Sequence, residues 1–298
     1  MIPSYLNLHI QDTIKKARDI LFDSLKRCNL CPRNCGVNRL NGEVGFCKIN
    51  RLAKVDSAFL HFGEEPELVG NGGSGTIFFS HCNLGCIYCQ NYNLSHLGEG
   101  SEVSAQELAE MMLSLQSQGA ENINFVTPTH VIVQILEALI IAIEKGLHLP
   151  LVYNCGGYEN LNVINLASGV FNIYMPDIKY SDNTVALKYS GVSDYWQVAQ
   201  AAVKEMHRQV GDLLIEKNVA KKGLLVRHLI LPNRLAGSFK VLDFIKDLSL
   251  QTYVNIMDQY RPCHMAYKFN ELLRRITQKE YSEVVNYAKE IGLHRGFG

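Results

Sequence analysis

Short apolar runs alternate with amphipathic segments along most of the chain, and this alternation is its main structural signal. The apolar runs are rich in β-branched and aromatic residues, which favour strands. The segments between them carry helix signals, such as the capping box Ser104-Ala-Gln-Glu107 and the terminating Gly146. We expect strands over residues 76–80, 122–126, 149–154, 171–175, 223–231 and 252–257.

Alternation of strands and helices predicts an α/β fold with a parallel sheet and helices outside it. Six such units indicate a partial (β/α)6 parallel barrel rather than a closed eight-stranded one. An opening helix is expected over residues 8–27, a long helical stretch over 181–218 and a final helix over 269–291. We divide the chain into an N-terminal helix with a cysteine-rich metal-binding segment (1–70), the barrel (71–262) and a C-terminal helical extension (263–298).

Composition narrows the classes of function. The chain has 298 residues with 29 basic and 29 acidic side chains, so net charge gives no reason to expect nucleic acid as a partner. The longest apolar run, residues 131–143, is too short to span a bilayer, so no membrane partner is expected either. The first residues lack the pattern of a signal peptide. We therefore expect a cytoplasmic protein, in which clustered thiols indicate metal or redox chemistry rather than disulfides.

Three of the nine cysteines stand close together directly after the first expected barrel strand. Cys82, Cys86 and Cys89 lie on a short loop, an arrangement that can direct three thiolates to one iron–sulfur cluster. A cluster with three cysteine ligands leaves one iron open to a substrate or cofactor. Zinc is the competing interpretation, with His81 or His96 as a fourth ligand. Three buried thiols without a metal are the third.

A second set of cysteines lies in the N-terminal segment. Cys28, Cys31, Cys35 and Cys47 are interspersed with proline, asparagine and glycine, so the segment has little hydrophobic capacity of its own. A bound metal would give such a segment a fixed shape. The set is typical of a second iron–sulfur cluster or of a structural zinc site, and the alternative is that it binds nothing.

Polar residues follow each of the other expected strands. Sites in parallel α/β folds form at the carboxyl ends of the strands, so these residues should meet at one rim. The candidates are Thr127 to His130, Asn154 to Gly157, Asp177 and Lys179, Arg227 and His228 or Pro232 and Asn233, and Asn255 with Asp258 to Tyr260.

The spacing C-x3-C-x2-C with Tyr88 before the last cysteine resembles the signature of the radical S-adenosylmethionine (SAM) superfamily. The wider pattern is similar to uncharacterised relatives of the pyruvate formate-lyase activating enzyme, including the radical SAM member of the AmmeMemoRadiSam group. The resemblance extends over residues 28–262, and the cysteine motifs are its specific part. The segments that carry it are residues 28–39, 86–91, 153–158, 175–179, 227–232 and 253–262.

The resemblance implies a [4Fe-4S] cluster on Cys82, Cys86 and Cys89, with SAM bound to its open iron. Reductive cleavage of SAM would produce a 5′-deoxyadenosyl radical that abstracts a hydrogen atom from the substrate, so the protein would be an oxidoreductase. The implied partners are a protein or peptide substrate and a reductant of the flavodoxin or ferredoxin type.

The resemblance also implies cofactor contacts. Lys179 would face the SAM carboxylate and His228 the ribose, while Asp177 would hold a cation or orient its neighbours. Tyr88 would lie near the adenine. Two further positions depart from the activating-enzyme pattern. Thr127 lies where a Gly-Gly-Glu segment is usual, and Asn154 lies where an aspartate is expected.

Simpler interpretations stand beside these. Asp177 and Lys179 can form a structural ion pair, and His228 can be a hydrogen-bonded core residue. His130 can cap the helix that follows it, and Cys155 and Cys263 can be small buried hydrophobic residues. At the level of function, the alternatives are a non-catalytic iron–sulfur protein for electron transfer or scaffolding, and a radical enzyme that acts on a small molecule.

Overall fold

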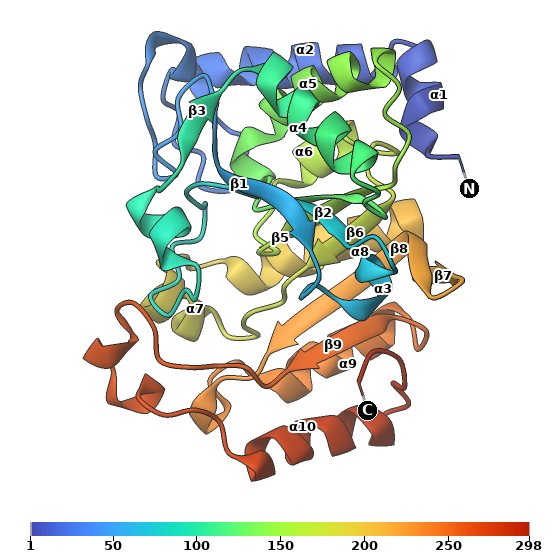
Figure 1. Ribbon diagram of the computed structural model, residues 1–298. Coiled ribbons are helices and arrows are strands. Elements are labelled where there is room, and N and C mark those ends of the chain that lie inside the picture. The colour runs from blue at the N-terminus through green and yellow to red at the C-terminus, as the bar shows by residue number, and fades with distance from the viewer. Residues whose placement is uncertain (1, 298) are drawn as a thin grey trace.

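Six parallel strands form the centre of the computed structural model, which describes residues 2–297 (Figure 1). Each strand is followed by helical structure, and within the described residues the first and last strands do not pair with each other. The prediction of an α/β fold with a partial (β/α)6 barrel is therefore confirmed. In spatial order the strands are β2 (Ser74–Phe79), β4 (Ile123–Val126), β5 (Leu151–Cys155), β6 (Ile173–Pro176), β8 (Val219–Leu229) and β9 (Tyr253–Met257).

Antiparallel strands extend the sheet beyond this parallel core. β1 (Ala53–His61) pairs with β2 and also with β3 (Ser101–Val103), while β7 (Leu214–Glu216) forms a hairpin with the first half of β8. The expected strands did not include β3 and β7. Both span three residues, which is too short for an alternating pattern to be recognised.

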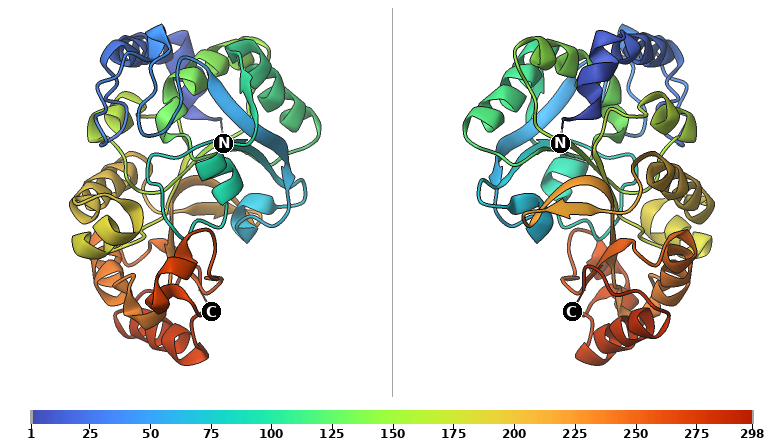
Figure 2. Two further views of the ribbon diagram at one scale, coloured as in Figure 1. Left: turned by 90° about the vertical axis from the view of Figure 1, so that its left-hand side faces the viewer. Right: turned by 90° about the vertical axis from the view of Figure 1, so that its right-hand side faces the viewer.

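Helices cover the outer face of the barrel, and the chain runs from its N-terminal elements at one end of the molecule to its C-terminal elements at the other (Figures 1 and 2). The predicted capping box is present, because Ser104 and Glu107 exchange hydrogen bonds at the start of the first barrel helix. These helices are α4 (Ala105–Ser117), α5 (Ile132–Glu144), α6 (Leu161–Leu166), α7 (Asn183–Ser190), α8 (Tyr195–Val210), α9 (Ser238–Leu248) and α10 (Gln278–Glu290).

Three expected helices are shorter than the sequence suggested. The opening helix is split into α1 (Ser4–Ile10) and α2 (Thr13–Asp23), because Asp12 adopts a left-handed conformation with φ of 57°. Gly191, with φ of 63°, separates α7 from α8. The final helix begins only at α10, after the capping residue Thr277. Among the described residues, no helix has both the length and the apolar character that crossing a membrane would require.

Strand alternation divides the barrel interior into an apolar layer and a polar layer. The short helix α3 (Pro66–Val69), between β1 and β2, places Leu68 against Val152, Met175 and Leu225 inside the barrel. Two residues further along β5 and β8, the inward positions are polar. This polar layer lies next to the carboxyl ends of the strands, where a site is expected.

Candidate functional site

A cavity of about 240 Å³ opens at the carboxyl ends of the barrel strands. Cys82, Cys86 and Cys89 line it from the loop after β2. Facing them are side chains at or just after the ends of four other strands, so the structure brings some of the expected strand-end residues together. They are Thr127 after β4, Asn154 of β5, Asp177 and Lys179 after β6, and Arg227 of β8.

The cysteine loop is anchored in the core between its cysteines. Leu84 is fully buried and Tyr88 nearly so. The Asn83 side chain donates a hydrogen bond to the Tyr158 carbonyl (2.6 Å), and the Ile87 amide donates one to the Tyr189 carbonyl (2.9 Å). The shape of the loop is therefore set by packing and hydrogen bonding.

Each of the three sulfur atoms accepts a hydrogen bond. The Leu84 amide donates to Cys82 Sγ (3.4 Å), the Ser190 hydroxyl to Cys86 Sγ (3.1 Å) and the Ser95 hydroxyl to Cys89 Sγ (3.1 Å). Donors of this kind stabilise thiolate ligands and tune the metal that they hold.

Burial, in contrast, disfavours the thiolate form of these cysteines. It raises the pKa of Cys82 to about 12, with a smaller contribution from the neighbouring Cys86, and it also raises the pKa of Cys89. A metal centre would compensate for this, since metals bind the deprotonated thiolate. The donor set therefore fits an iron–sulfur cluster.

Opposite the cysteines, Asp177 joins two cationic side chains. Its carboxylate accepts hydrogen bonds from Lys179 Nζ (2.8 Å) and from Arg227 Nε (2.8 Å). Burial alone would raise the pKa of Asp177, but Arg227 and Lys179 outweigh it and lower that pKa. Burial would likewise lower the pKa of Lys179, and Asp177 reverses this, so the pKa of the ammonium group is raised. All three groups are thus held in the charged form.

A glutamate that the sequence analysis did not select completes this network. Glu64 precedes α3 and reaches into the polar layer of the barrel, where its carboxylate accepts hydrogen bonds from Asn124 (2.9 Å) and Arg227 (3.3 Å). Arg227 also donates to the Asn154 side chain (2.8 Å). No local pattern marks Glu64, because its partners lie 60 and 163 residues away in the sequence.

Thr127 lines the cavity in an unusual backbone conformation. Its φ is 61°, in the left-handed region that β-branched residues rarely adopt, and its amide donates to the Asn154 carbonyl (2.8 Å). Strain of this kind is concentrated at functional sites. The backbone at Thr127 therefore departs from the extended conformation of β4, and its peptide groups point in other directions than they would in a strand.

Tyr88 and His228 occupy different environments. Tyr88 lines the cavity, and its ring packs edge-on against Tyr180 and Tyr260. His228 is fully buried and does not line the cavity. Its Nδ1 lies 2.6 Å from the Ile178 carbonyl and its Nε2 lies 2.8 Å from the Ser238 hydroxyl.

The expected contact of His228 with a ribose therefore has no support in this arrangement. Strand alternation explains the difference, because Arg227 points into the barrel and the next residue must point outward. The alternative of a hydrogen-bonded core histidine describes His228.

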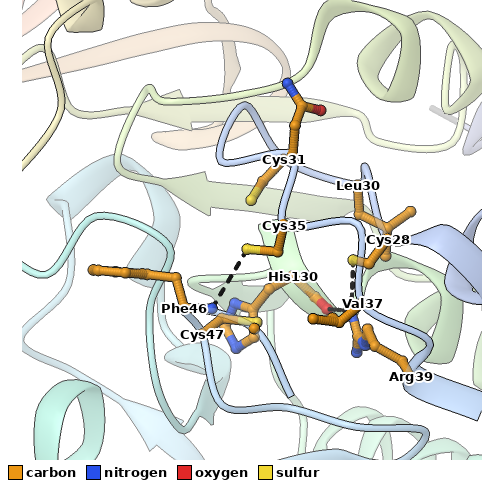
Figure 3. Close-up of a pocket in the computed structure, with 11 residues that line it drawn as sticks. Cys28, Leu30, Cys31, Cys35, Val37, Arg39, Phe46, Cys47 and His130 are labelled. Atoms are coloured by element: carbon orange, nitrogen blue, oxygen red, sulfur yellow. Dashed lines mark hydrogen bonds between the residues drawn. The ribbon is translucent and has the colours of Figure 1, made fainter. Parts of the chain in front are cut away.

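The N-terminal cysteines lie apart from this cavity and line a narrow cavity of their own (Figure 3). Cys28, Cys31 and Cys47 are buried, whereas Cys35 is exposed and its sulfur accepts a hydrogen bond from the Phe46 amide (3.4 Å). Burial raises the pKa of Cys31 to about 12. Arg39 and His130 line the same cavity.

Arg33 connects the two cysteine regions. Its guanidinium donates to the carbonyls of Asn83 (2.9 Å) and Leu84 (2.8 Å), inside the loop after β2. It also donates to the carbonyls of Ser190 (3.0 Å) and Gly191 (2.7 Å), at the end of α7. The sequence analysis missed this role, although Arg33 lies within the segment of residues 28–39 that carries the resemblance.

Within residues 2–297, no three Cys, His, Asp or Glu side chains lie close enough together to share one metal ion as they stand. Metal binding at either cysteine set would therefore draw the thiols inward. Both loops carry their sulfur atoms on the walls of a cavity, so the thiols have room for this movement.

Known proteins resemble this chain in sequence and in fold. No protein-family model matches the chain. The uncharacterized protein MJ0674 of Methanocaldococcus jannaschii is 30% identical over 285 residues, which span 92% of this chain and 78% of that protein. The pyruvate formate-lyase-activating enzyme of Clostridium pasteurianum is 23% identical over 249 residues, which span 78% of this chain and 97% of the enzyme.

Two solved structures share the fold. A radical SAM methyltransferase from Sphaerobacter thermophilus has a TM-score of 0.51 at 12% identity, over 76% of this chain and 66% of that one. Native anSMEcpe with bound AdoMet has a TM-score of 0.50 at 12% identity, over 73% of this chain and 61% of that one. The fold is thus that of radical SAM enzymes.

The chain belongs to one family with MJ0674, and its fold and its similarity to a pyruvate formate-lyase-activating enzyme support the predicted place in the radical SAM superfamily. The predicted cofactors, a [4Fe-4S] cluster and SAM, agree with these relatives, one of which was solved with AdoMet bound.

Proposed function

We propose that this protein is a radical SAM enzyme that holds a [4Fe-4S] cluster on Cys82, Cys86 and Cys89 and abstracts a hydrogen atom from a protein or peptide. The observation that carries the proposal is the single cavity that these cysteines share with the charged strand-end residues. When bound, the cluster supplies the electron that cleaves SAM into methionine and the 5′-deoxyadenosyl group that takes the hydrogen atom.

The residues opposite the cysteines would bind the methionine part of SAM. Lys179 and Arg227 are fixed cations on the cavity wall, suited to the carboxylate, and Asp177 orients both. Thr127 and Asn154 offer oxygen atoms for the amino group, in place of the Gly-Gly-Glu segment of activating enzymes. Tyr88 borders the same space and would limit the position of the adenine.

Apolar side chains complete the cavity wall and would exclude water from the reacting atoms. Leu84, Val126, Leu229 and Met257 all line it. Exclusion of water strengthens the electrostatic interactions inside a site and suppresses side reactions.

The surroundings of the cavity favour a large substrate. Among the described residues that line it, none belongs to the N-terminal segment of residues 2–70 or to α10. A wall built from either of these would favour a small molecule. We therefore propose a protein or peptide substrate, and a flavodoxin- or ferredoxin-type reductant in the cytoplasm.

We also propose that the N-terminal set of Cys28, Cys31, Cys35 and Cys47 forms a second metal site, for an iron–sulfur cluster or zinc. Its thiols share one cavity. Three of them are buried, and a metal would hold their sulfur atoms together in this cavity.

The test measures 5′-deoxyadenosine. Anaerobically purified protein, reconstituted with iron and sulfide, is reduced with dithionite and supplied with SAM. We expect 5′-deoxyadenosine from the wild type and none from Cys86→Ala. Cys263→Ala is the matched control, because Cys263 belongs to neither cysteine set, and it should behave as wild type.

Cleavage of SAM without the substrate can be slow, so a second measurement tests whether SAM binds at the cluster. SAM should change the electron paramagnetic resonance spectrum of the reduced cluster in the wild type. Zinc in place of iron on the loop after β2, or a reduced cluster with neither product nor any spectral response to SAM, would contradict the proposal.

A further inference from the structure

His130 presents a free nitrogen to the N-terminal cysteines. It lies in a short 3-10 helix (Thr129–Val131) directly after β4, and its side chain is 1% exposed. Nε2 lies 2.9 Å from the Ser80 carbonyl. A carbonyl only accepts hydrogen bonds, so Nε2 carries the proton and Nδ1 keeps a lone pair.

The Nδ1 atom is buried and has no hydrogen-bond partner among the described residues. The imidazole lines the same cavity as the four cysteines (Figure 3). Buried polar atoms are nearly always paired, so an unpaired one needs an explanation. A histidine whose other ring nitrogen donates to a backbone carbonyl is the usual arrangement of a metal-binding imidazole.

Arg39 is a second, independent sign of a ligand in this cavity. Its side chain is 1% exposed, and it donates to the carbonyls of Asn50 (2.8 Å) and His130 (2.8 Å). Its Nη1 also lies 3.9 Å from Cys28 Sγ, while Nη2 has no partner. Within the described chain, no carboxylate forms a salt bridge with it.

A buried cation without a counter-charge is strongly disfavoured. Metal centres bound by several thiolates carry net negative charge, whether they are zinc sites or iron–sulfur clusters. Such a centre in the cysteine cavity would neutralise Arg39 and occupy the lone pair of His130 at the same time.

We propose that His130 Nδ1 is a ligand of the metal centre held by the N-terminal cysteines, and that Arg39 is its buried counter-charge. The inference rests on the metal site proposed above, and it is independent of SAM cleavage. Zinc and iron–sulfur centres both accept mixed cysteine and histidine ligands. With His130 there are five donors for four positions, and Cys35 is the exposed one that the centre would leave free.

The test uses a Cys82→Ser/Cys86→Ser/Cys89→Ser variant of the full chain, in which only the N-terminal site can hold metal. Metal and acid-labile sulfide analysis comes first. Zinc without sulfide identifies a single ion, and iron with sulfide identifies a cluster. We expect one of the two, and a variant that binds neither would overturn the inference. The deoxyadenosine assay on the wild type would then still stand, so the two failures are distinguishable.

Substitutions in this background identify the ligands. We expect His130→Ala to lose metal to a chelator about tenfold more readily than the parent. His148→Ala is the control, since His148 is exposed and hydrogen-bonded within its own turn. Cys28→Ala should resemble His130→Ala, Cys35→Ala should resemble the parent, and Arg39→Met should weaken retention more than Arg39→Lys.

Spectra exclude a purely structural role for the histidine. A zinc site refilled with Co²⁺ should change its d–d bands in His130→Ala. A reduced cluster should lose the coupling of a directly bound nitrogen in pulsed electron paramagnetic resonance. Metal retention and spectra that are unchanged in His130→Ala, together with loss of metal in Cys35→Ala, would establish a four-cysteine site and overturn the inference.

Discussion

In the loop after β2, side chains between the cysteines are buried in the core, and the sulfur atoms receive hydrogen bonds from Leu84, Ser95 and Ser190. In the N-terminal segment, more than half of the residues between Cys31 and Cys47 are exposed, and the sulfur atoms line a narrow cavity. The first region is shaped by the barrel before any metal binds. We propose that the second depends on a bound metal for its shape.

This difference suits two kinds of metal site, one with an open position on the metal and one without. A site that must leave one metal position open for a substrate or cofactor needs a protein that fixes the remaining ligands. A closed site that fills all its positions can use the metal itself as the structural element. Arg33 joins the two, because it extends from the metal-dependent segment to the carbonyls of the barrel loop.

The strongest test of the comparison is removal of both metals. We expect hydrogen exchange of the Cys28 and Gly36 amides, which bond to Val37 and Cys28 carbonyls, to accelerate about 100-fold as the segment opens locally. The Ile87 amide, bonded to the Tyr189 carbonyl, should change much less. Mass spectrometry of exchanged peptides measures both in one sample. Equal acceleration in the two regions would contradict the distinction.

Substitution of Asp177 should disrupt the ion pairs that it forms with Lys179 and Arg227 opposite the cysteines. Asp177→Asn leaves Lys179 and Arg227 without their shared carboxylate in a mostly buried position, which should cost about 3–5 kcal/mol in the free energy of unfolding. Asp247→Asn, on the exposed face of α9, is the control and should have little effect. Urea unfolding of the two variants gives the comparison. A loss of similar size in both would mean that the network contributes nothing.

The free energy of unfolding should respond to pH through the buried carboxyl group of Glu159. This carboxyl group accepts hydrogen bonds from Thr129 (2.7 Å) and Tyr153 (2.8 Å), and burial raises its pKa from 4.5 to about 7. The folded state therefore binds more protons between pH 4.5 and 7, and stability falls as pH rises through that window. The free energy of unfolding falls by about 3 kcal/mol in total, at roughly 1.4 kcal/mol for each unit of the difference in pKa.

Glu159→Gln removes this titration. We expect the unfolding free energy of the wild type, relative to that of the variant, to fall by about 3 kcal/mol between pH 4.5 and 7.5. Urea midpoints across the range measure it. A difference that stays constant with pH would show that Glu159 ionises normally in the folded protein.

The smallest expected effect concerns Arg33, which connects the two cysteine regions. Arg33→Lys keeps the charge but loses the planar guanidinium that donates to four carbonyls. It should therefore lower the free energy of unfolding by about 2 kcal/mol. It should also weaken SAM binding with the cluster still present, since the loop after β2 loses a support. Iron content and SAM affinity measured together check this. Unchanged SAM affinity would make Arg33 a support of the N-terminal segment only.

The sequence predicted the barrel well because its strands are apolar runs separated by clear helix signals. The cysteine sets were equally visible, since their spacing is local. His228 was misplaced because a strand that is apolar on both faces does not reveal which side chains point inward. Arg33 and Glu64 escaped attention for another reason. Their partners lie 50 to 163 residues away, and contacts of that range leave no local pattern.

Arg33 contacts only main-chain oxygen atoms at each of its four hydrogen bonds. This support therefore sets no requirement of its own on the side chains at positions 83, 84, 190 and 191, which other contacts constrain. Arginine at position 33 has no such freedom. Among relatives that share this architecture, we expect the arginine at this position to be invariant.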